Sequence, residues 1–495
     1  MAKKYIIAFD QGTTSTRTIL FDEHAKVVAI SQKELTQHHP ESGWVEHDPM
    51  EIFRDQQATF REVLKTSGIS IEAITGIGIT NQRETTVVWN KKTGEPIYNA
   101  IVWLDNRTHE ICDRLKKKGL QTYIAENTGL VIDSYFSGTK LAWILDHVKG
   151  AREKAEKGEL LFGTIDSWLI YKFTKGKQHV TDHTNASRTL LYNIKELQWD
   201  GRILDVLKIP KGMLPLVQTS SSYFGDVDID GHRIPILGVA GDQQAALFGQ
   251  GGFTPGIAKN TYGTGCFMLL NTGTEAVSSK NGLLTTIACS LPDTEIQYAL
   301  EGSIFIGGAS IQWLRDNLLL IKNASETESI CEETQELKDL YVVPAFAGLG
   351  APYWDSEAKG AMYGLTLDTG KNEIIKATVE ALALQTKDVL NAMQQDCNKK
   401  VQQLQVDGGA SANNYLMQFQ ADMLNVPVER PKMLEVTALG AAFLAGLHAG
   451  VWELSELNKS REIERLFQPI MDNLVREEKY KGWLTAIERT KSNHE

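Results

Sequence analysis

The chain has 495 residues, a length typical of two or more domains, and its 42% hydrophobic and 23% charged residues allow a large core and exclude bulk disorder. Its mass is 55.0 kDa and its isoelectric point is near 5.6. The net charge of −11 disfavours a general nucleic-acid binder, which needs a surplus of Lys and Arg facing the phosphates.

The N-terminus and the cysteines predict a cytoplasmic protein that is not stably inserted in a membrane. The apolar run that starts at Tyr5 ends at Asp10, too early for a signal peptide, and no later apolar run approaches the ~18 residues of a membrane span. The five cysteines are scattered, odd in number and without a C-x-x-C pair. They therefore predict reduced thiols rather than a disulfide framework or a structural zinc site.

The first strands are predicted to form an antiparallel meander. Residues 5–9 have the pattern of a buried strand, and 16–21 and 26–31 follow after short turns, too close for parallel crossovers. Residues 74–80 and 85–89 predict another pair of neighbouring strands. Strand-like and helix-like stretches alternate along the rest of the chain, which predicts an α/β protein.

The second half of the chain repeats this opening. The segment 260–265 (NTYGTG) turns into a strand, much as 10–14 (DQGTT) does near the N-terminus. We therefore expect a duplicated arrangement, with an N-terminal domain over 1–250 and a C-terminal domain over 251–495. Further on, apolar residues at helical spacing over 379–393 predict a core helix.

Three glycine-containing turns are suited to phosphate, although the sequence has no P-loop and no G-x-G-x-x-G motif. Asp10–Ser15 follows a buried strand, and its amides and hydroxyls can point at phosphate oxygens, with Asp10 as a Mg²⁺ ligand and Arg17 as a fixed positive charge. Gly263–Gly265 is a second such turn, and Gly408–Ser411 opens a helix. A hairpin turn or ordinary capping by Ser411 would explain each one alone, but together they favour a nucleotide held between two lobes.

Asp242 is the candidate catalytic carboxylate. Residues 238–246 (GVAGDQQAA) predict a buried strand that ends at Asp242 and then a helix, which places the carboxylate in the crevice where open α/β sheets bind ligands. An enzyme that transfers a phosphoryl group to an alcohol must orient the hydroxyl and accept its proton, and an aspartate can do both. An N-cap role for the same side chain is equally compatible with the pattern.

Several segments resemble the FGGY carbohydrate kinases, within the actin/hexokinase/chaperone ATPase superfamily. They are FDQGTTSTR (9–17), NQRETT (81–86), YFSGTKLAWILDH (135–147), GDQQAALFG (241–249), NTYGTGCF (260–267) and residues 360–380. The resemblance extends from Tyr5 to about Trp483. It implies an α/β fold of two RNase H-like domains, of the actin/hexokinase ATPase type, with a central interdomain cleft that closes on the substrate.

The resemblance also implies an activity, the phosphorylation of glycerol by MgATP at a terminal carbon to give sn-glycerol 3-phosphate. Asp242 would be the general base and Asp10 would lie near Mg²⁺. The residues implied in glycerol binding are Arg83, Glu84, Trp103, Tyr135, Asp242, Gln243 and Phe267. Those implied in ATP or ADP binding are Thr13, Thr14, Ser15, Arg17, Thr264, Gly308, Gln312, Gly409 and Asn413. The expected partners are glycerol and MgATP, with no nucleic acid, in a homodimer or homotetramer.

Two other functions remain open at this point. One is phosphorylation of a ketopentose or another polyol, although four residues favour a smaller substrate: Arg83, Glu84, Trp103 and Phe267. The other is a non-enzymatic nucleotide switch like actin, which would not need Asp242 and the Arg83-Glu84 turn assembled around a triol. Some members of the family are regulated through a loop before the strand that holds the base, by fructose 1,6-bisphosphate or by phosphorylation of a histidine. Here that loop, 228–233 (DIDGHR), departs from both patterns, and His232 is expected to be a plain surface histidine.

Overall fold

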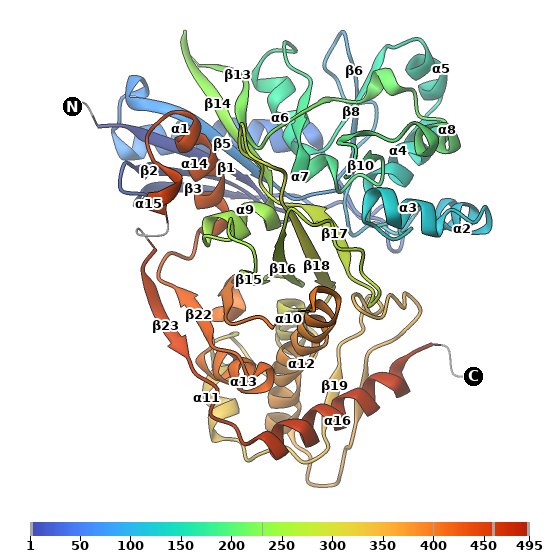
Figure 1. Ribbon diagram of the computed structural model, residues 1–495, viewed down its shortest axis with the longest axis vertical. Coiled ribbons are helices and arrows are strands. Elements are labelled where there is room, and N and C mark those ends of the chain that lie inside the picture. Colours follow the sequence, from blue (N-terminus) through green and yellow to red (C-terminus); the bar gives the residue numbers. More distant parts are fainter. Residues whose placement is uncertain (1–2, 230, 399, 458–460, 493–495) are drawn as a thin grey trace.

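Two mixed β-sheets organise the computed structural model, which describes residues 3–229, 231–398, 400–457 and 461–492 (Figure 1). The sheet of the first half has the strand order β13-β14-β5-β1-β2-β3. Its strands are β1 (Tyr5–Gln11), β2 (Ser15–Asp22), β3 (Val27–Glu34), β5 (Ile74–Asn81), β13 (Ser221–Ile229) and β14 (His232–Gly241). Strand β1 (YIIAFDQ) is buried along its whole length, as expected for a central strand covered on both faces.

The sheet of the second half has the strand order β17-β18-β16-β15-β21-β22-β23. Its strands are β15 (Ala258–Tyr262), β16 (Cys266–Gly273), β17 (Leu284–Ile287), β18 (Tyr298–Ile304), β21 (Leu404–Asp407), β22 (Val428–Pro431) and β23 (Ile463–Phe467). The strands β15, β16 and β18 are almost entirely buried, and they form the floor of the second core.

The two sheets share a topology. In the first, β2 lies antiparallel between β1 and β3, while β5 and β14 continue the sheet in parallel on the other side of β1. In the second, β16 lies antiparallel between β15 and β18, while β21 and β22 continue in parallel on the other side of β15. The predicted meander and the predicted repeat of strand, turn and strand are therefore confirmed.

The expected pairing of residues 74–80 with 85–89 is wrong. The first segment forms β5, whose two edges are occupied by the parallel strands β1 and β14. The second contributes to β6 (Val87–Asn90), which pairs antiparallel with β8 (Leu160–Gly163) outside the main sheet. A hairpin partner has no free edge on β5, so the residues that follow this strand leave the sheet at its carboxyl end.

The other elements pack on these sheets or on one another. In the first half they are α1 (Pro49–Ser67), α2 (His109–Lys117), α3 (Gln121–Thr128), α4 (Ser137–His147), α5 (Ala151–Glu156), α6 (Ile165–Phe173), α7 (His183–Ala186), α8 (Gly201–Leu207), α9 (Asp242–Gly249) and the short strands β4 (Glu46–His47), β7 (Ala100–Ile101), β9 (Val180–Asp182), β10 (Tyr192–Asn193), β11 (Gln198–Trp199) and β12 (Leu216–Gln218). In the second half they are α10 (Gly308–Asp316), α11 (Glu326–Glu333), α12 (Lys371–Cys397), α13 (Asn414–Leu424), α14 (Val436–His448), α15 (Leu454–Leu457), α16 (Asn473–Thr490), β19 (Tyr341–Val343) and β20 (Ala361–Tyr363). The predicted core helix over 379–393 is confirmed as part of α12.

Helices α9 and α14 join the two halves. Helix α9 packs on β15 and β16 of the second sheet, whereas α14, from the C-terminal part of the chain, packs on β1, β5 and β14 of the first (Figure 1). The two helices also pack tightly on each other: a Cβ atom added to Gly440 in α14 would lie 1.9 Å from the carbonyl oxygen of Ala245 in α9. The first residue of α9 is therefore held at the junction between the sheets.

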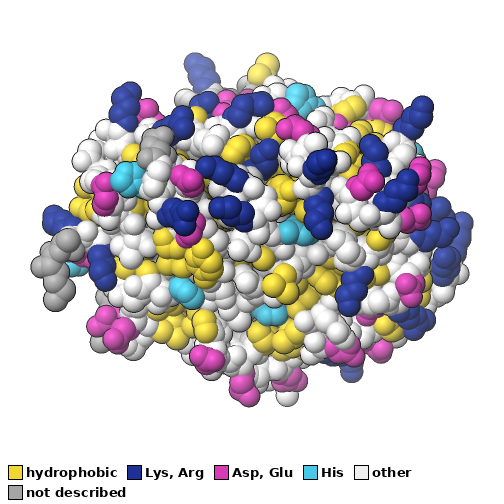
Figure 2. Space-filling view, turned by 90° about the horizontal axis from the view of Figure 1, so that it is seen from above, with side chains coloured by type: hydrophobic (Ala, Val, Ile, Leu, Met, Phe, Trp, Pro, Cys, Tyr) yellow, Lys and Arg dark blue, Asp and Glu magenta, His cyan; other side chains and the backbone are white. Residues whose placement is uncertain are grey.

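The surface of the protein carries charges of both signs. On the face shown in Figure 2, Lys and Arg side chains are interspersed with Asp and Glu. Within the described residues, none of the helices combines the length and the apolar character that crossing a membrane requires. His232 is exposed on the β13–β14 hairpin, as expected, with Nδ1 3.5 Å from Oε1 of Glu72. Asp230 in the same loop lies outside the described residues.

Candidate active site

Asp242 is the first residue of α9, directly after β14, as the sequence predicts. The N-cap is Gly241, and the Oδ1 atom of Asp242 accepts a hydrogen bond from the backbone N–H of Gln243 at 2.8 Å. The same oxygen lies 3.3 Å from Nε of Arg83, and 30% of the Asp242 side chain is exposed. Its surroundings raise the pKa of Asp242, because burial disfavours the charged form more strongly than Arg83 and Lys259 favour it.

Arg83 and Glu84 follow β5 at its carboxyl end, and both are buried. Glu84 has a left-handed backbone, with φ of 59°, which turns the chain sharply away from the sheet. Arg83 donates from Nη1 and Nη2 to the two oxygens of Glu301 on β18, at 2.6 and 2.9 Å. Glu84 accepts from Nε of Arg188 at 2.6 Å. We call Arg83, Glu84 and Asp242 the polar cluster.

Sequence reasoning missed Glu301 and Arg188. Both are isolated charged residues in otherwise ordinary segments, LEGS in a buried strand and ASRT after a short helix. A charged residue inside a buried strand carries a large desolvation cost unless it is paired, and this is the one signal that could have found Glu301. Its partners lie 218 and 113 residues away in the chain, so they become visible only in the fold.

Three aromatic side chains lie together next to the polar cluster. The ring of Trp103 is 5.5 Å from that of Tyr135 and 5.8 Å from that of Phe267, both in edge-to-face arrangements. Trp103 and Tyr135 come from loops of the first half, and Phe267 comes from β16 of the second. All three are more than nine-tenths buried. We call this group the aromatic slot.

The turn between β1 and β2 reaches the aromatic slot directly. The indole N–H of Trp103 donates to the hydroxyl of Thr13 at 2.9 Å. The turn itself is closed by a hydrogen bond from the amide of Gly12 to the carbonyl of Ser15 at 2.9 Å, which leaves Thr14 exposed. The residues predicted to hold phosphate and those predicted to hold the acceptor are therefore brought into contact.

Arg17 bridges two acidic side chains beside this turn. Its Nη2 atom pairs with Asp10 at the end of β1, and its Nη1 atom donates to Glu435, just before α14, at 2.6 Å. Asp10 is buried. The attraction of Asp10 raises the pKa of Arg17 further above its ordinary value, so the guanidinium stays charged.

Gln243 is held by a buried lysine that the sequence analysis did not single out. Nζ of Lys259 on β15 donates to Oε1 of Gln243 at 2.5 Å and to the hydroxyl of Thr261 at 2.7 Å. Burial lowers the pKa of Lys259 to about 8, although Asp407 and Asp242 oppose the shift. Because the amide oxygen of Gln243 faces this amine, its NH₂ group points the other way and is available as a donor.

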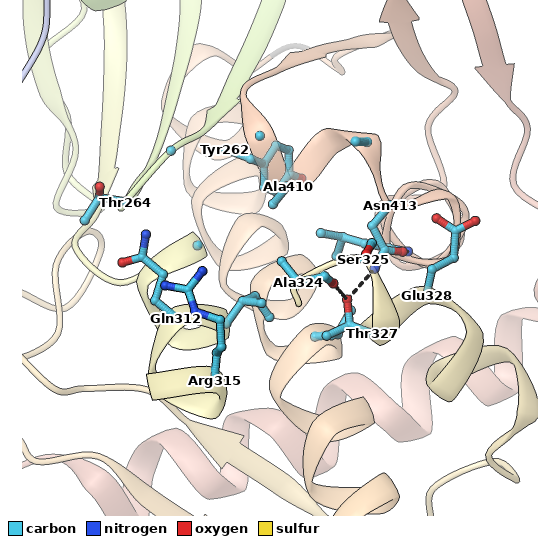
Figure 3. A pocket seen from close by; sticks show the side chains of 17 residues that line it. Tyr262, Thr264, Gln312, Arg315, Ala324, Ser325, Thr327, Glu328, Ala410 and Asn413 are labelled. Atoms are coloured by element: carbon cyan, nitrogen blue, oxygen red, sulfur yellow. Dashed lines mark hydrogen bonds between the residues drawn. The ribbon is translucent and has the colours of Figure 1, made fainter. Parts of the chain in front are cut away.

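A cavity of about 500 Å³ opens in the second half, within the range of small-molecule sites (Figure 3). The predicted nucleotide residues of this half all line it: Thr264, Gly308, Gln312, Gly409 and Asn413. Other lining residues come from α10, from α11 and from the segment between them: Arg315, Ala324, Ser325, Thr327 and Glu328. Sequence analysis missed these residues because no motif marks them. The predicted residues of the first half, Thr13, Thr14, Ser15 and Arg17, do not line this cavity.

Asn413 has a structural role at the cavity wall. It is the N-cap of α13, where its Oδ1 atom accepts from the amide of Leu416 at 2.9 Å, and its amide donates to the hydroxyl of Thr327 at 3.1 Å (Figure 3). Capping of the helix by Ser411, the alternative explanation of this turn, does not occur, because Ser411 lies in the preceding 3-10 turn and donates to the carbonyl of Gly408.

Comparisons with known proteins agree with this arrangement. Residues 5–249 match the model for the FGGY family of carbohydrate kinases, N-terminal domain, and residues 258–449 match that for the C-terminal domain. The chain is 60% identical over 491 residues to the glycerol kinase of Alkaliphilus metalliredigens, covering 98% of each chain. It is similar to the crystal structure of Plasmodium falciparum glycerol kinase with ADP, with a TM-score of 0.91, 38% identity and 99% of each chain covered.

A more distant structure supports the fold alone. The ligand-bound xylulose kinase of Lactobacillus acidophilus superposes with a TM-score of 0.87 at 24% identity, over 98% of each chain. The family models cover both halves, and the relatives match along nearly the whole length. The chain therefore belongs to the FGGY family of carbohydrate kinases.

Proposed function

We propose that this kinase transfers the γ-phosphoryl group of ATP to a terminal hydroxyl of glycerol, giving sn-glycerol 3-phosphate and ADP, the entry step of glycerol catabolism. The observation that carries the proposal is the position of the aromatic slot beside the polar cluster, where the charges of Glu84 and Arg83 act on the Tyr135 hydroxyl and Thr13 of the phosphate turn is bonded to Trp103. The relative from Alkaliphilus metalliredigens and the structure from Plasmodium falciparum both bear the name glycerol kinase.

The side chains present suit a small triol. Glycerol has little apolar area, so its affinity must come from directed hydrogen bonds. Arg83 can only donate and an ionised Glu84 can only accept, which allows neighbouring hydroxyls to be held with defined polarity. The NH₂ group of Gln243 adds a donor. The aromatic slot can pack against the CH₂ edges and would limit the length of the carbon chain that is accepted.

Asp242 is proposed as the general base. Its carboxylate is partly exposed and lies 3.3 Å from Arg83, so it can accept a hydrogen bond from the terminal hydroxyl and take its proton as the bond to phosphorus forms. Arg83 remains charged throughout, because the pKa of its guanidinium lies far above neutral pH. The proton transfer therefore occurs beside a fixed positive charge, which favours the ionised form of Asp242 and opposes the effect of burial.

ATP would be bound from both halves of the chain. The cavity of the second half takes the nucleoside end, and the turn of Thr13, Thr14 and Ser15 meets the terminal phosphates with Arg17. Backbone amides and hydroxyls of such a turn, together with a fixed guanidinium, are suited to phosphate oxygens.

Mg²⁺ would accompany the ATP, with Asp10 as its protein ligand. Mg²⁺ in phosphoryl-transfer sites usually takes one or two carboxylates together with phosphates and waters, and a single buried carboxylate beside the phosphate turn fits that requirement. Within the described residues, no set of three or more His, Cys, Asp or Glu side chains is arranged to hold a metal ion by itself. When bound, the ion would neutralise negative charge on the phosphates.

Closure of the two lobes around glycerol is proposed to exclude water, which would otherwise accept the phosphoryl group. The expected hinge is the segment Gly249–Gly256. Gly251 and Gly256 have positive φ, and a Cβ added to Gly256 would meet nothing within 4 Å, whereas one added to Gly249 would lie 2.1 Å from the carbonyl of Val436. Movement would therefore be concentrated at the end of the segment.

The remaining expectations belong to the same proposal: domains over 1–250 and 251–495, a cytoplasmic location and a homodimer or homotetramer. Small-angle scattering tests closure and assembly in one experiment. Addition of glycerol and ADP should decrease the radius of gyration at constant mass, and the mass should correspond to two or four chains. An unchanged radius with both ligands bound would contradict the closure.

The activity itself is tested by identification of the product. The purified protein is incubated with glycerol, ATP and Mg²⁺, and the phosphorylated product is analysed by ³¹P NMR and by a stereospecific dehydrogenase assay. The expected product is sn-glycerol 3-phosphate in a one-to-one ratio with ADP. Free inorganic phosphate as the main product would indicate a nucleotide switch instead, and phosphorylation of xylulose in preference to glycerol would indicate a different sugar kinase.

A further inference from the structure

Four buried charged side chains form a closed ring beneath the proposed glycerol site. Arg83 donates to both oxygens of Glu301, and Glu301 accepts from Nη2 of Arg188 at 3.0 Å. Arg188 donates from Nε to Glu84 at 2.6 Å, and the Oε1 atom of Glu84 lies 3.9 Å from Nε of Arg83. Each of the four side chains is at most 2% exposed. We call these residues the charge ring.

The charge ring connects the two halves of the protein. Arg83, Glu84 and Arg188 belong to the first half, whereas Glu301 lies on β18 in the second sheet. Glu301 also accepts from the hydroxyl of Ser303 at 3.1 Å, so its carboxylate is fixed from its own strand. The support for the substrate-facing residues of one half is therefore supplied by the other.

We propose that Glu301 and Arg188 are positioning residues of the phosphoryl transfer: Glu301 fixes the guanidinium of Arg83, and Arg188 fixes the carboxylate of Glu84. The proposal rests on the proposed function, because both supported residues are those that would hold glycerol. Bidentate pairing with Glu301 sets the plane of the guanidinium and directs its Nε edge toward Asp242. Neither Glu301 nor Arg188 needs to touch the substrate to have this effect.

The charges explain why Glu301 matters for the base. Burial raises the pKa of Glu301, but Arg188 and Arg83 outweigh it and lower that pKa to about 2, so Glu301 stays negative at all working pH values. Asp242 is faced by Arg83 after β5, by Lys259 on β15 and by Glu301 on β18. Without Glu301, Arg83 would be free to pair with Asp242 and to neutralise the base.

Arg188 supports a second element of the site. Its guanidinium carbon lies 5.6 Å from the centre of the Tyr135 ring and 5.4 Å from that of Phe136. Its Nη1 atom is buried and has no hydrogen-bond partner among the described residues. The side chain is thus held by Glu84 and Glu301 on one edge and by the rings on its face, and it ties Glu84 to the aromatic slot.

The test compares Glu301→Gln with Asp388→Asn as a matched control. Asp388 is also a buried carboxylate, but it lies on α12 and accepts from Tyr480 at 2.7 Å and from Trp483 at 2.8 Å rather than from a residue of the charge ring. We expect Glu301→Gln to decrease kcat/KM for glycerol at least about tenfold, because Arg83 loses its charged partner. The acid limb of the kcat/KM profile should move to lower pH, since loss of Glu301 lowers the pKa of Asp242. KM for ATP should be unchanged.

A second variant controls for misfolding of Glu301→Gln, in which the buried charge of an arginine is left without its partner. The double variant Glu301→Gln with Arg188→Met removes one charge of each sign, and it should fold while still showing the decrease in kcat/KM for glycerol, through a higher KM. Asp388→Asn should keep the wild-type pH profile and KM for glycerol even if its melting temperature decreases. The positioning role is contradicted if both ring variants are folded and keep the wild-type KM and pH profile.

The wild-type protein separates this proposal from the function on which it rests. If the wild type releases no ADP in response to glycerol, the proposed function is wrong and the positioning role falls with it. If the wild type is active and the ring variants match Asp388→Asn in every kinetic parameter, only the positioning role is wrong.

Discussion

Nε of Arg83 lies 3.3 Å from Oδ1 of Asp242, although the two residues are separated by a whole set of strands and helices in the chain. Arg83 stands at the carboxyl end of β5, and Asp242 follows the carboxyl end of the neighbouring parallel strand β14. Parallel pairing therefore brings a fixed cation and a candidate base to the same edge of the sheet. The predictions below depend on this pair and on its neighbours.

Replacement of Asp242 by Asn should abolish most of the turnover but keep glycerol binding. An amide keeps the size and a hydrogen-bonding oxygen, but it cannot take a proton, so kcat should decrease at least ~10²-fold. Calorimetric titration should show that glycerol still binds in the presence of ADP. Near-normal kcat in a folded Asp242→Asn protein would remove Asp242 from the role of base.

The pH dependence of kcat/KM for glycerol should report Asp242. A base must be ionised, so the rate decreases as pH falls through its pKa, and burial raises this pKa above the ordinary value of an aspartate. The acid limb should therefore lie at higher pH than an unperturbed aspartate would give. Lys259→Met removes a cation that lowers the pKa of Asp242, so it should move the limb to still higher pH, opposite to Glu301→Gln. An acid limb at the same pH in the wild type, Lys259→Met and Glu301→Gln would show that a group other than Asp242 titrates.

Phe267 should limit the size of the acceptor. Its ring closes one side of the aromatic slot, 5.8 Å from Trp103. Phe267→Leu opens space there, so KM for glycerol should increase several-fold and the relative rate with four- and five-carbon polyols should rise. The control is Phe60→Leu, a fully buried ring in the core of the first half, which should lower stability without changing selectivity. Unchanged ratios of polyol rates in Phe267→Leu would contradict the role of the slot.

Gly241 should be required for the position of Arg83. A Cβ atom at this residue would lie 2.7 Å from Cγ and Cδ of Arg83, closer than real contacts allow. Gly241→Ala should displace Arg83 and increase KM for glycerol at least about tenfold, an effect of the size found when buried hydrogen bonds are broken. Gly201→Ala is the control, since a Cβ there meets nothing within 4 Å. Equal KM values for the two variants would mean that Arg83 does not depend on this close approach.

Asn413 should affect both the nucleotide and the stability of α13. Asn413→Ala removes the N-cap and the hydrogen bond to Thr327 at the cavity wall, so ADP should bind more weakly and the free energy of unfolding should fall by about 1 kcal/mol. Asp48→Ala removes the N-cap of α1, away from the cavity, and should produce only the stability change. ADP affinity that is equal in the two variants would exclude Asn413 from the nucleotide site.

The sequence predicts local features of this fold well. Short spacing between the strands of 5–31 leaves no room for a crossover, and a periodic apolar face over 379–393 leaves little alternative to a core helix, so both predictions are confirmed. The pairing of 74–80 with 85–89 failed because the edges of β5 are filled by strands from elsewhere in the chain. The local sequence around residues 74–89 does not show that distant strands compete for the edges of β5.

The sequence identified residues of the candidate site only where they belong to a recognisable motif. Thr264, Gly308 and Asn413 were expected at the nucleotide site, and they line one cavity. Arg188, Lys259 and Glu301 carry no local pattern, because their role is to pair with charges far away in the chain. Such residues are recognised only when burial and partners are known.

Release of ADP, measured with and without glycerol and across a series of polyols, tests the central claim most directly. The account predicts slow release with ATP alone, a large increase on addition of glycerol, and smaller increases with longer polyols, all lost in Asp242→Asn. ATP consumption at the same rate with and without glycerol would contradict it.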